Sequence, residues 1–228
     1  MAEESWVRRP QQSRSQRTEE KIVEAALSLL EQEKFDEITV AEIARKAGIS
    51  VGGFYARFPS KESLLHWFDE SFVEDFVREG MELFATDRWD GKGNCDIIRA
   101  YLAMGAARFR KHRGLLAQIT LRARGTPDES FRNRIQRVNH ELHSRFRGLL
   151  LERKGQMGHP DPAFAIDLGL NVVSAALRET MLFADFSRPS FRPVAPDKLV
   201  EELTALYCAY LQVPLEGGTG KRGRRSRT

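Results

Sequence analysis

Residues 39–65 read TVAEIARKAGISVGGFYARFPSKESLL, and this stretch decides the fold. Thr39 and Glu42 match the Ser/Thr-x-x-Glu pattern of a capping box, which predicts that a short helix begins at Thr39. Gly48 suits the left-handed turn that ends such a helix, and Ser50 can cap the helix that follows. The stretch therefore predicts two short helices joined by a tight turn.

The helix after Ser50 has two faces of different character. Phe54 and Phe58 are four residues apart and point together, so we expect both in a small hydrophobic core. Val51 and Tyr55 are also four residues apart, and we expect them to be exposed on the other face. Two short helices joined by a glycine-containing turn predict a helix-turn-helix, whose second helix enters the major groove of DNA.

The rest of the chain has the apolar spacing of helices and no alternating pattern typical of strands. A first helix is expected over 18–33, and Ser60 can cap a long helix that reaches Leu83. Breaks rich in Gly and Pro separate the later helices, which we place near 95–111, 114–124, 128–154, 162–186 and 196–212. The predicted fold class is all-α, with about nine helices.

Composition places the chain among ordinary globular proteins, with 228 residues, 41% hydrophobic and 30% charged. The net charge of +4 comes from residues 215–228, so it does not by itself argue for a nucleic-acid partner. Cys95 and Cys208 belong to no Cys-x-x-Cys pair, and we expect neither a disulfide nor a zinc site, as in a reducing cytosol. Because no apolar leader follows Met1 and no apolar stretch is long enough to span a bilayer, we expect a cytoplasmic protein.

Many residues of the N-terminal region occur at the spacing of one known family. The matching positions are Ile22, Ala25, Ala26, Leu29, Phe35, Thr39, Val40, Glu42, Ile43, Ala44, Ala47, Gly48, Ile49, Ser50, Gly52, Tyr55, Phe58, Lys61, Glu62, Leu64 and Leu65. At these positions the chain resembles the tetracycline-repressor (TetR/AcrR) family of one-component transcriptional regulators. The resemblance implies a homodimer with a three-helix DNA-binding head and a larger helical domain that binds a small molecule and thereby releases DNA.

This resemblance, together with the residue pattern, divides the chain into four predicted segments. They are a mobile arm (1–16), a helix-turn-helix DNA-binding domain (17–60), an effector-binding and dimerisation domain (61–213) and a disordered basic tail (214–228).

The resemblance also implies which residues contact DNA. Ser50, Val51, Gly52 and Gly53 occupy positions that approach bases, and Thr39, Tyr55 and Lys61 occupy positions that hold phosphates. Arg45 and Arg57 are candidates for further phosphate contacts. The family often carries Lys where this chain has Val51, and Thr where it has Gly53. We therefore expect fewer hydrogen bonds to bases, a contact between Val51 and a thymine methyl group, and a larger share for groove shape.

The large domain holds an excess of basic residues, with 13 basic and four acidic side chains over 108–154. Most of them are expected on solvated helix faces. Two alternatives are that some line the entrance of an effector cavity and favour an anionic ligand, such as a carboxylate or a phosphate-bearing thioester, or that they form a second nucleic-acid surface. The apolar residues predicted to line this pocket, although each is also a candidate for the core, are Phe68, Phe72, Met104, Phe109, Leu116, Ile119, Phe131, Val138 and Phe183.

The last two helices carry apolar residues at intervals of three and four. In the family the corresponding helices form a four-helix dimer interface, and small residues permit close approach. The residues predicted for this interface are Leu168, Val172, Ala175, Ala176, Glu179, Leu203, Leu206, Tyr207 and Tyr210. Two-fold symmetry of the dimer then predicts a pseudo-palindromic operator.

Two patterns suggest other chemistry and are set aside. Residues 48–52 fit the G-x-S-x-G motif of hydrolases, but that motif follows a strand, whereas Ser50 follows a predicted helix, so no enzyme is expected. His140 and His143 share a helix face without a third metal ligand, and we expect exposed histidines. The predicted function is a ligand-responsive transcriptional repressor without cofactor or metal, and the alternative is an effectorless or architectural DNA-binding protein.

Overall fold

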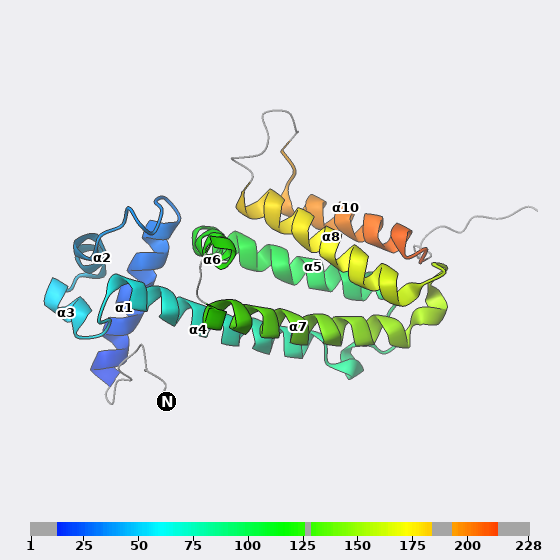
Figure 1. Ribbon diagram of the computed structural model, residues 1–228, viewed down its shortest axis with the longest axis horizontal. Helices are drawn as coiled ribbons and strands as arrows, with labels where there is room; N and C mark the ends of the chain where they lie inside the picture. Colours follow the sequence, from blue (N-terminus) through cyan, green and yellow to red (C-terminus); the bar gives the residue numbers. More distant parts are fainter. Residues whose placement is uncertain (1–12, 126–128, 184–192, 214–228) are drawn as a thin grey trace, which may run out of the picture.

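The computed structural model describes residues 13–125, 129–183 and 193–213 (Figure 1). Within these ranges the chain forms helices and loops and contains no strand, so the all-α prediction is confirmed. The α-helices are α1 (Ser13–Leu30), α2 (Val40–Ala47), α3 (Val51–Tyr55), α4 (Lys61–Leu83), α5 (Asn94–Lys111), α6 (Arg113–Gly125), α7 (Glu129–Glu152), α8 (Pro162–Leu182) and α10 (Pro196–Tyr210). Two 3-10 turns are η1 (Thr86–Trp89) and η2 (Lys154–Gln156). No helix in the described ranges is both long enough and apolar enough to cross a lipid bilayer.

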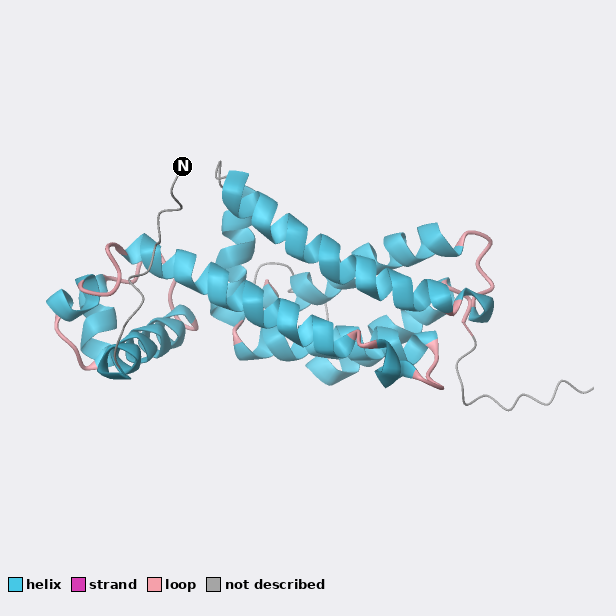
Figure 2. Cartoon of the chain, turned by 90° about the horizontal axis from the view of Figure 1, so that it is seen from below, coloured by secondary structure: helices cyan, strands magenta, loops and turns pink. Residues whose placement is uncertain are grey.

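The helices form a small head and a larger body at opposite ends of the molecule (Figure 1). The head consists of α1, α2 and α3, and α4 runs from it along the body beside α7 (Figures 1 and 2). In the body, α5 packs against both α8 and α10, which lie side by side at one edge. One long helix therefore belongs to both parts.

Two side-chain caps and one glycine define the helix ends on either side of the turn in the head. The Thr39 hydroxyl accepts a hydrogen bond from the Glu42 amide at 3.2 Å, and the Glu42 carboxylate accepts one from the Thr39 amide at 2.8 Å. Gly48 ends α2 in the left-handed region, with φ of 67°. The Ser50 hydroxyl accepts a hydrogen bond from the Gly53 amide at 3.0 Å and so caps α3. The predicted capping box, glycine stop and serine cap are thus confirmed.

The head has a hydrophobic core of its own. Phe54 and Phe58 are fully buried in it, with ring centroids 5.6 Å apart. Ile22 of α1 and Ile43 of α2 are also fully buried there. Because the first turns of α4 and Leu115 of α6 complete the same cluster, the head is packed onto the body rather than tethered to it.

A second connection between head and body lies where α6 meets the end of α1. Gly114 approaches α1 so closely that a Cβ atom there would clash with the Leu30 carbonyl. The Gly114 amide donates to Glu31 Oε1 at 3.1 Å, and towards the other end of α1 Trp67 of α4 donates its indole N–H to Glu19 Oε1 at 3.1 Å. Position 114 therefore requires glycine, and both α4 and α6 hold the head.

The structure contradicts the prediction that the two cysteines form no disulfide. Cys95, in the first turn of α5, is bonded to Cys208, near the end of α10, and their Cα atoms are 5.8 Å apart. The two residues are 113 positions apart in the sequence, and only the packing of α5 against α10 brings them together. The cysteines therefore no longer support a reducing compartment, and the cytoplasmic location stays a prediction.

The predicted arm is shorter in the structure than expected from the sequence. α1 begins at Ser13, so residues 13–16 are helical and Thr18 lies inside the helix instead of capping it. Polar residues without an apolar stripe give no helical periodicity, yet an exposed helix end does not need one. The helix also ends at Leu30 instead of residue 33. Residues 1–12 and the predicted basic tail, 214–228, lie outside the described residues.

Candidate DNA-binding and effector sites

Helix α3 has one exposed face and one buried face, as the spacing of its residues predicted. Val51 is 44% exposed and Tyr55 is 49% exposed, whereas Phe54 and Phe58 on the opposite face are fully buried. Gly52 is exposed as well, and a Cβ atom there would meet only the Ser50 hydroxyl. The helix thus presents its N-terminal residues and one aromatic ring to solvent while the two phenylalanines anchor it.

The other polar residues predicted to hold phosphates lie in or next to α2, directly after α3 and at the start of α4. The Thr39 hydroxyl donates to Glu42 Oε2 at 2.7 Å within the capping box, and Arg45 is exposed at the end of α2. Arg57 is half-buried, and its Nε has no hydrogen-bond partner among the described residues. Arg45 is therefore the exposed cation of this group, and Arg57 is partly exposed with a buried Nε.

Lys61 binds backbone carbonyl groups in the structure, and its predicted phosphate contact stays a prediction. Its ammonium donates to the carbonyls of Phe35 at 2.8 Å, Ile38 at 2.8 Å and, less closely, Asp36 at 3.4 Å. It also lies 4.6 Å from the centroid of the Phe35 ring. Since a lysine has three donor hydrogens, this network uses all of them. Lys61 therefore ties the start of α4 to the loop between α1 and α2.

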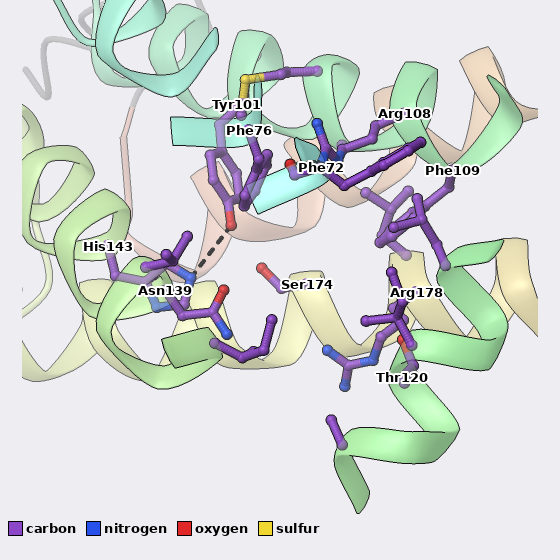
Figure 3. A pocket seen from close by; sticks show the side chains of 18 of the residues that line it. Phe72, Phe76, Tyr101, Arg108, Phe109, Thr120, Asn139, His143, Ser174 and Arg178 are labelled. Atoms are coloured by element: carbon purple, nitrogen blue, oxygen red, sulfur yellow. Dashed lines mark hydrogen bonds between the residues drawn. The ribbon is translucent and has the colours of Figure 1, made fainter. Parts of the chain in front are cut away.

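The body contains a cavity of about 420 Å³ between α4, α5, α6, α7 and α8 (Figure 3). Its walls are formed by Phe72, Phe76, Tyr101, Met104, Gly105, Arg108, Phe109, Leu116, Ile119, Thr120, Ala123, Arg124, Ile135, Val138, Asn139, His143, Ser174, Leu177 and Arg178. A cavity of this size, mostly apolar with a few polar groups, is typical of a small-molecule site.

Six of the nine residues predicted for the pocket line it, namely Phe72, Met104, Phe109, Leu116, Ile119 and Val138. Phe68 does not, because it points into the core of the head, and Phe183 packs beside the wall without lining it. The side chain of Phe131 lies outside those that the structure describes. Of the basic cluster over 108–154, Arg108 and Arg124 line the cavity.

His143 is not the exposed histidine that the sequence suggested. Its ring lines the cavity, and its Nε2 lies 3.4 Å from the Tyr101 hydroxyl (Figure 3). Burial, together with the nearby His140, lowers the pKa of His143, and burial raises the pKa of Tyr101. Both side chains are therefore neutral near pH 7 and offer hydrogen bonds without charge.

The residues that sequence reasoning missed are mainly the polar ones. Tyr101, Ser174 and Arg178 line the cavity from helices whose apolar pattern was assigned to core or dimer contacts. Arg178 was the most accessible signal, because it is a charged residue directly after the uncharged stretch 168–177 of α8. A charged side chain next to an apolar face more often has a functional role than a role in packing.

His112 connects the cavity wall to α5 and gives a pH-dependent contribution to stability. Its ring packs edge-on against Phe72, with centroids 4.6 Å apart, and burial lowers its pKa from 6.5 to about 4. The unfolded chain binds a proton below pH 6.5 that the folded protein takes up only near pH 4. Stability is therefore expected to be constant above this window and to fall as the pH drops through it.

The measurement is the urea midpoint of the protein and of a His112→Gln variant between pH 8 and pH 4. Both proteins lose stability in acid through their carboxylates, so the difference between the two curves isolates His112. The gap is expected to narrow from about pH 6.5 downwards, in the window given by its pKa values. Parallel curves would contradict a buried, neutral His112.

An apolar stripe is exposed on the outer face of α8 and α10. Phe164 is 56% exposed, Leu168 42%, Val172 49% and Leu206 55%. Three of these residues follow one another at intervals of four along α8, so they form a continuous surface. Phe164 was not among the predicted interface residues, although this interval was visible in the sequence.

Two residues predicted for the dimer interface are buried inside the chain instead. Leu203 is 8% exposed and Tyr207 is fully buried, and the Tyr207 hydroxyl donates to the carbonyl of Ile166. Gly169 permits this packing, because a Cβ atom there would clash with the Tyr207 ring. The apolar face of α10 is wide enough for contacts on two sides. Its inner half packs against α5 and α8 of the same chain.

Comparison with known proteins gives a match in sequence and a match in fold. Residues 22–66 match the family described as bacterial regulatory proteins, tetR family. The nucleoid occlusion factor SlmA of Aliivibrio fischeri is 27% identical over 194 residues, which cover 85% of this chain and 95% of that protein.

Two solved structures share the fold at low sequence identity. The fatty acid degradation regulator FadR from Bacillus halodurans has a TM-score of 0.62 at 18% identity and covers 90% of this chain and 100% of that one. FadR from Bacillus subtilis, solved in complex with stearoyl-CoA, has a TM-score of 0.59 at 16% identity and covers 85% and 97%.

Proposed function

This chain is a member of the TetR family of DNA-binding transcriptional regulators, and from that premise we propose that it is a ligand-responsive repressor acting as a homodimer. The observation that supports this proposal most directly is that the chain has both an exposed helix α3 and a cavity partly lined by α4. Helix α4 joins the head to the body. A likeness in fold to a regulator solved with stearoyl-CoA supports a ligand in the body.

The DNA-binding surface consists of the exposed face of α3 and the cations around it. Val51 and Tyr55 project from the face that would enter the major groove, and Gly52 and Gly53 let the backbone approach closely. Val51 offers methyl groups to a thymine methyl, and Arg45 and Arg57 supply phosphate contacts. Because Val51 lies at the centre of this face and cannot form hydrogen bonds with bases, part of the sequence specificity comes from the shape of the DNA groove.

The exposed stripe of Phe164, Leu168, Val172 and Leu206 is the proposed dimer interface. A two-fold axis through this stripe makes each residue meet the same surface on the partner and leaves the two heads free to bind DNA. The recognition helices of such a dimer bind half-sites about 34–36 Å apart, or a multiple of this, so the operator is pseudo-palindromic.

Release from DNA follows from the position of α4. Phe72 and Phe76 of α4 form part of the cavity wall, and Arg108 of α5 donates to the Phe72 carbonyl. At its other end, α4 is held to the head by Lys61, so a ligand that displaces the wall moves the head with it. A change in the separation of paired heads then prevents both from fitting the grooves together.

Removal of the Tyr55 ring tests the DNA-binding surface. A duplex selected from a random pool by the full-length protein serves as the operator, and affinity is measured at fixed salt. Tyr55→Ala is expected to weaken binding about tenfold or more, since a phosphate contact and its packing are lost. Leu121→Ala, at a residue 50% exposed on α6, is the matched control and should bind normally. Full affinity of Tyr55→Ala would exclude this face from the interface.

The proposed methyl contact has its own test on the same duplex. Replacing thymine by uracil removes the methyl group from one base at a time. The native protein should lose affinity at one position, whereas Val51→Ala should no longer distinguish the two bases. Equal discrimination by both proteins would contradict the contact.

A second candidate function is that of an effectorless DNA-binding protein. It is favoured by the likeness to a nucleoid occlusion factor, which extends over 95% of that relative and so includes the body as well as the head. The two candidates differ in one measurement. A small molecule that changes operator affinity, with a coupling of about 1–3 kcal/mol, identifies a ligand-responsive regulator, and an affinity that no cavity ligand alters favours the effectorless protein.

A further inference from the structure

Three arginines line the cavity, and one of them is committed to the fold. Arg108 forms an ion pair with Glu79 at 3.6 Å and donates to the Phe72 carbonyl. Its guanidinium lies over two rings of α4, at 5.5 Å from the centroid of Phe72 and 4.7 Å from that of Phe76. Arg108 therefore joins α5 to α4 and has little capacity left for a ligand.

Arg178 and Arg124 enter the wall from α8 and α6 without comparable partners. No carboxylate among the side chains that the structure describes lies within ion-pair distance of either, and the Nε of Arg178 is buried there without a hydrogen-bond partner. The Arg124 guanidinium lies 6.0 Å from the centroid of the Phe183 ring. Burial and the neighbouring Arg124 lower the pKa of Arg178. Two adjacent guanidinium groups, one with a buried donor that has no partner in the described part of the chain, are stabilised by a shared anion.

The opposite end of the cavity is polar but carries no charge. It is formed by the neutral pair of Tyr101 and His143, while Arg178 and Thr120 lie at the other end (Figure 3). Ser174 lies between the two ends. Its buried hydroxyl is near Tyr101 but forms no hydrogen bond of normal geometry with it. A neutral oxygen of a ligand fits among these groups, whereas burial disfavours a charge.

Most of the remaining wall is apolar. It includes Phe72, Phe76, Met104, Val138 and Leu177, and the cavity volume of about 420 Å³ is at the lower end of the range for small-molecule sites. The site thus has a cationic end, a neutral polar end and otherwise mainly apolar walls. This combination of surfaces matches a compact amphipathic molecule with one anionic group.

We propose that the cavity binds an amphipathic monocarboxylate whose carboxylate is held by Arg178 and Arg124 and whose apolar body packs between Phe72, Phe76 and Met104. A guanidinium group binds a carboxylate through two parallel hydrogen bonds, which gives direction as well as charge. The inference rests on the proposed function only in taking this cavity as the effector site. A phosphate of a larger thioester is the other anion that two arginines bind, and the experiment separates the two.

The experiment compares acids with neutral molecules of the same shape. Calorimetry measures binding of dodecanoate, 1-dodecanol, 4-phenylbutanoate, 4-phenylbutanol and lauroyl-CoA to the full-length dimer in the absence of DNA. At least one acid should bind more tightly than its alcohol. Arg178→Gln and Arg124→Gln should each weaken that acid about tenfold or more and leave the alcohol unchanged, because the loss of a charge-assisted hydrogen bond is specific to the acid.

Arg145→Gln is the control, since Arg145 lies on α7 in a surface ion pair with Glu141 and does not line the cavity. Thermal unfolding of each variant confirms that it is folded. Two results would overturn the proposal: acids that bind no better than their alcohols, or lauroyl-CoA that binds more tightly than dodecanoate through the same arginines.

A separate measurement distinguishes this inference from the proposed function. If an acid binds in an Arg178-dependent way but leaves operator affinity unchanged, the ligand class stands and the repressor mechanism fails. If only a neutral molecule releases DNA, the mechanism stands and the carboxylate assignment fails.

Discussion

Replacing Phe54 with Ala is expected to unfold the head and abolish DNA binding. Phe54 is fully buried and packs against Phe58 inside a cluster that belongs to the head. A buried Phe→Ala change costs about 3–5 kcal/mol, because it removes apolar contacts and leaves a cavity. That loss is a large part of the roughly 5–15 kcal/mol that stabilises a typical domain. The measurement is urea unfolding followed by circular dichroism, together with operator binding.

Tyr55→Ala provides the control for this substitution, since the two aromatic residues are neighbours on α3 and differ mainly in burial. Tyr55 is 49% exposed, so its removal should change the free energy of unfolding by no more than about 0.5 kcal/mol while it weakens DNA binding. Phe54→Ala should lose both properties. A Phe54→Ala protein as stable as Tyr55→Ala would contradict the division of α3 into a buried and an exposed face.

Glutamate at the centre of the exposed stripe is expected to convert the dimer to monomers. Val172→Glu and Leu206→Glu each place a charge in the proposed interface, and the two-fold axis doubles the effect. Sedimentation should show a single-chain mass, and operator affinity should fall steeply because two linked heads bind together more tightly than one. Leu121→Glu, on an exposed residue outside the stripe, should remain dimeric. A dimer that persists in both stripe variants would place the interface elsewhere.

The head could be predicted from sequence because its determinants are local. The capping box of Thr39 and Glu42, the left-handed Gly48 and the cap at Ser50 act over three or four residues, and each was confirmed. The burial of Phe54 and Phe58 followed from a single interval of four. The contacts of Lys61 could not be predicted in this way, because its partners are carbonyl groups more than 20 residues away, which no local pattern reveals.

The cavity could be predicted only in part because five helices form it. Apolar spacing identified six wall residues, but it could not separate Phe72, which lines the cavity, from Phe68, which points into the head four residues earlier. The same limit explains the disulfide. The distance between Cys95 and Cys208 depends on how α5 and α10 pack, and their separation of 113 residues gives no information about it.

The disulfide closes part of the chain into a covalent ring, and the N-terminal helices lie outside this ring. The ring runs from Cys95 to Cys208 and contains most of the cavity wall, whereas α1, α2, α3 and α4 lie before it. A single peptide-bond cut inside the ring leaves both fragments attached to each other, but a cut between Tyr55 and Cys95 leaves the recognition helix on a separate fragment. Proteolysis of the oxidised protein can therefore separate the DNA-binding helix from the ligand site, while the part of the cavity wall between Cys95 and Cys208 stays one covalent piece.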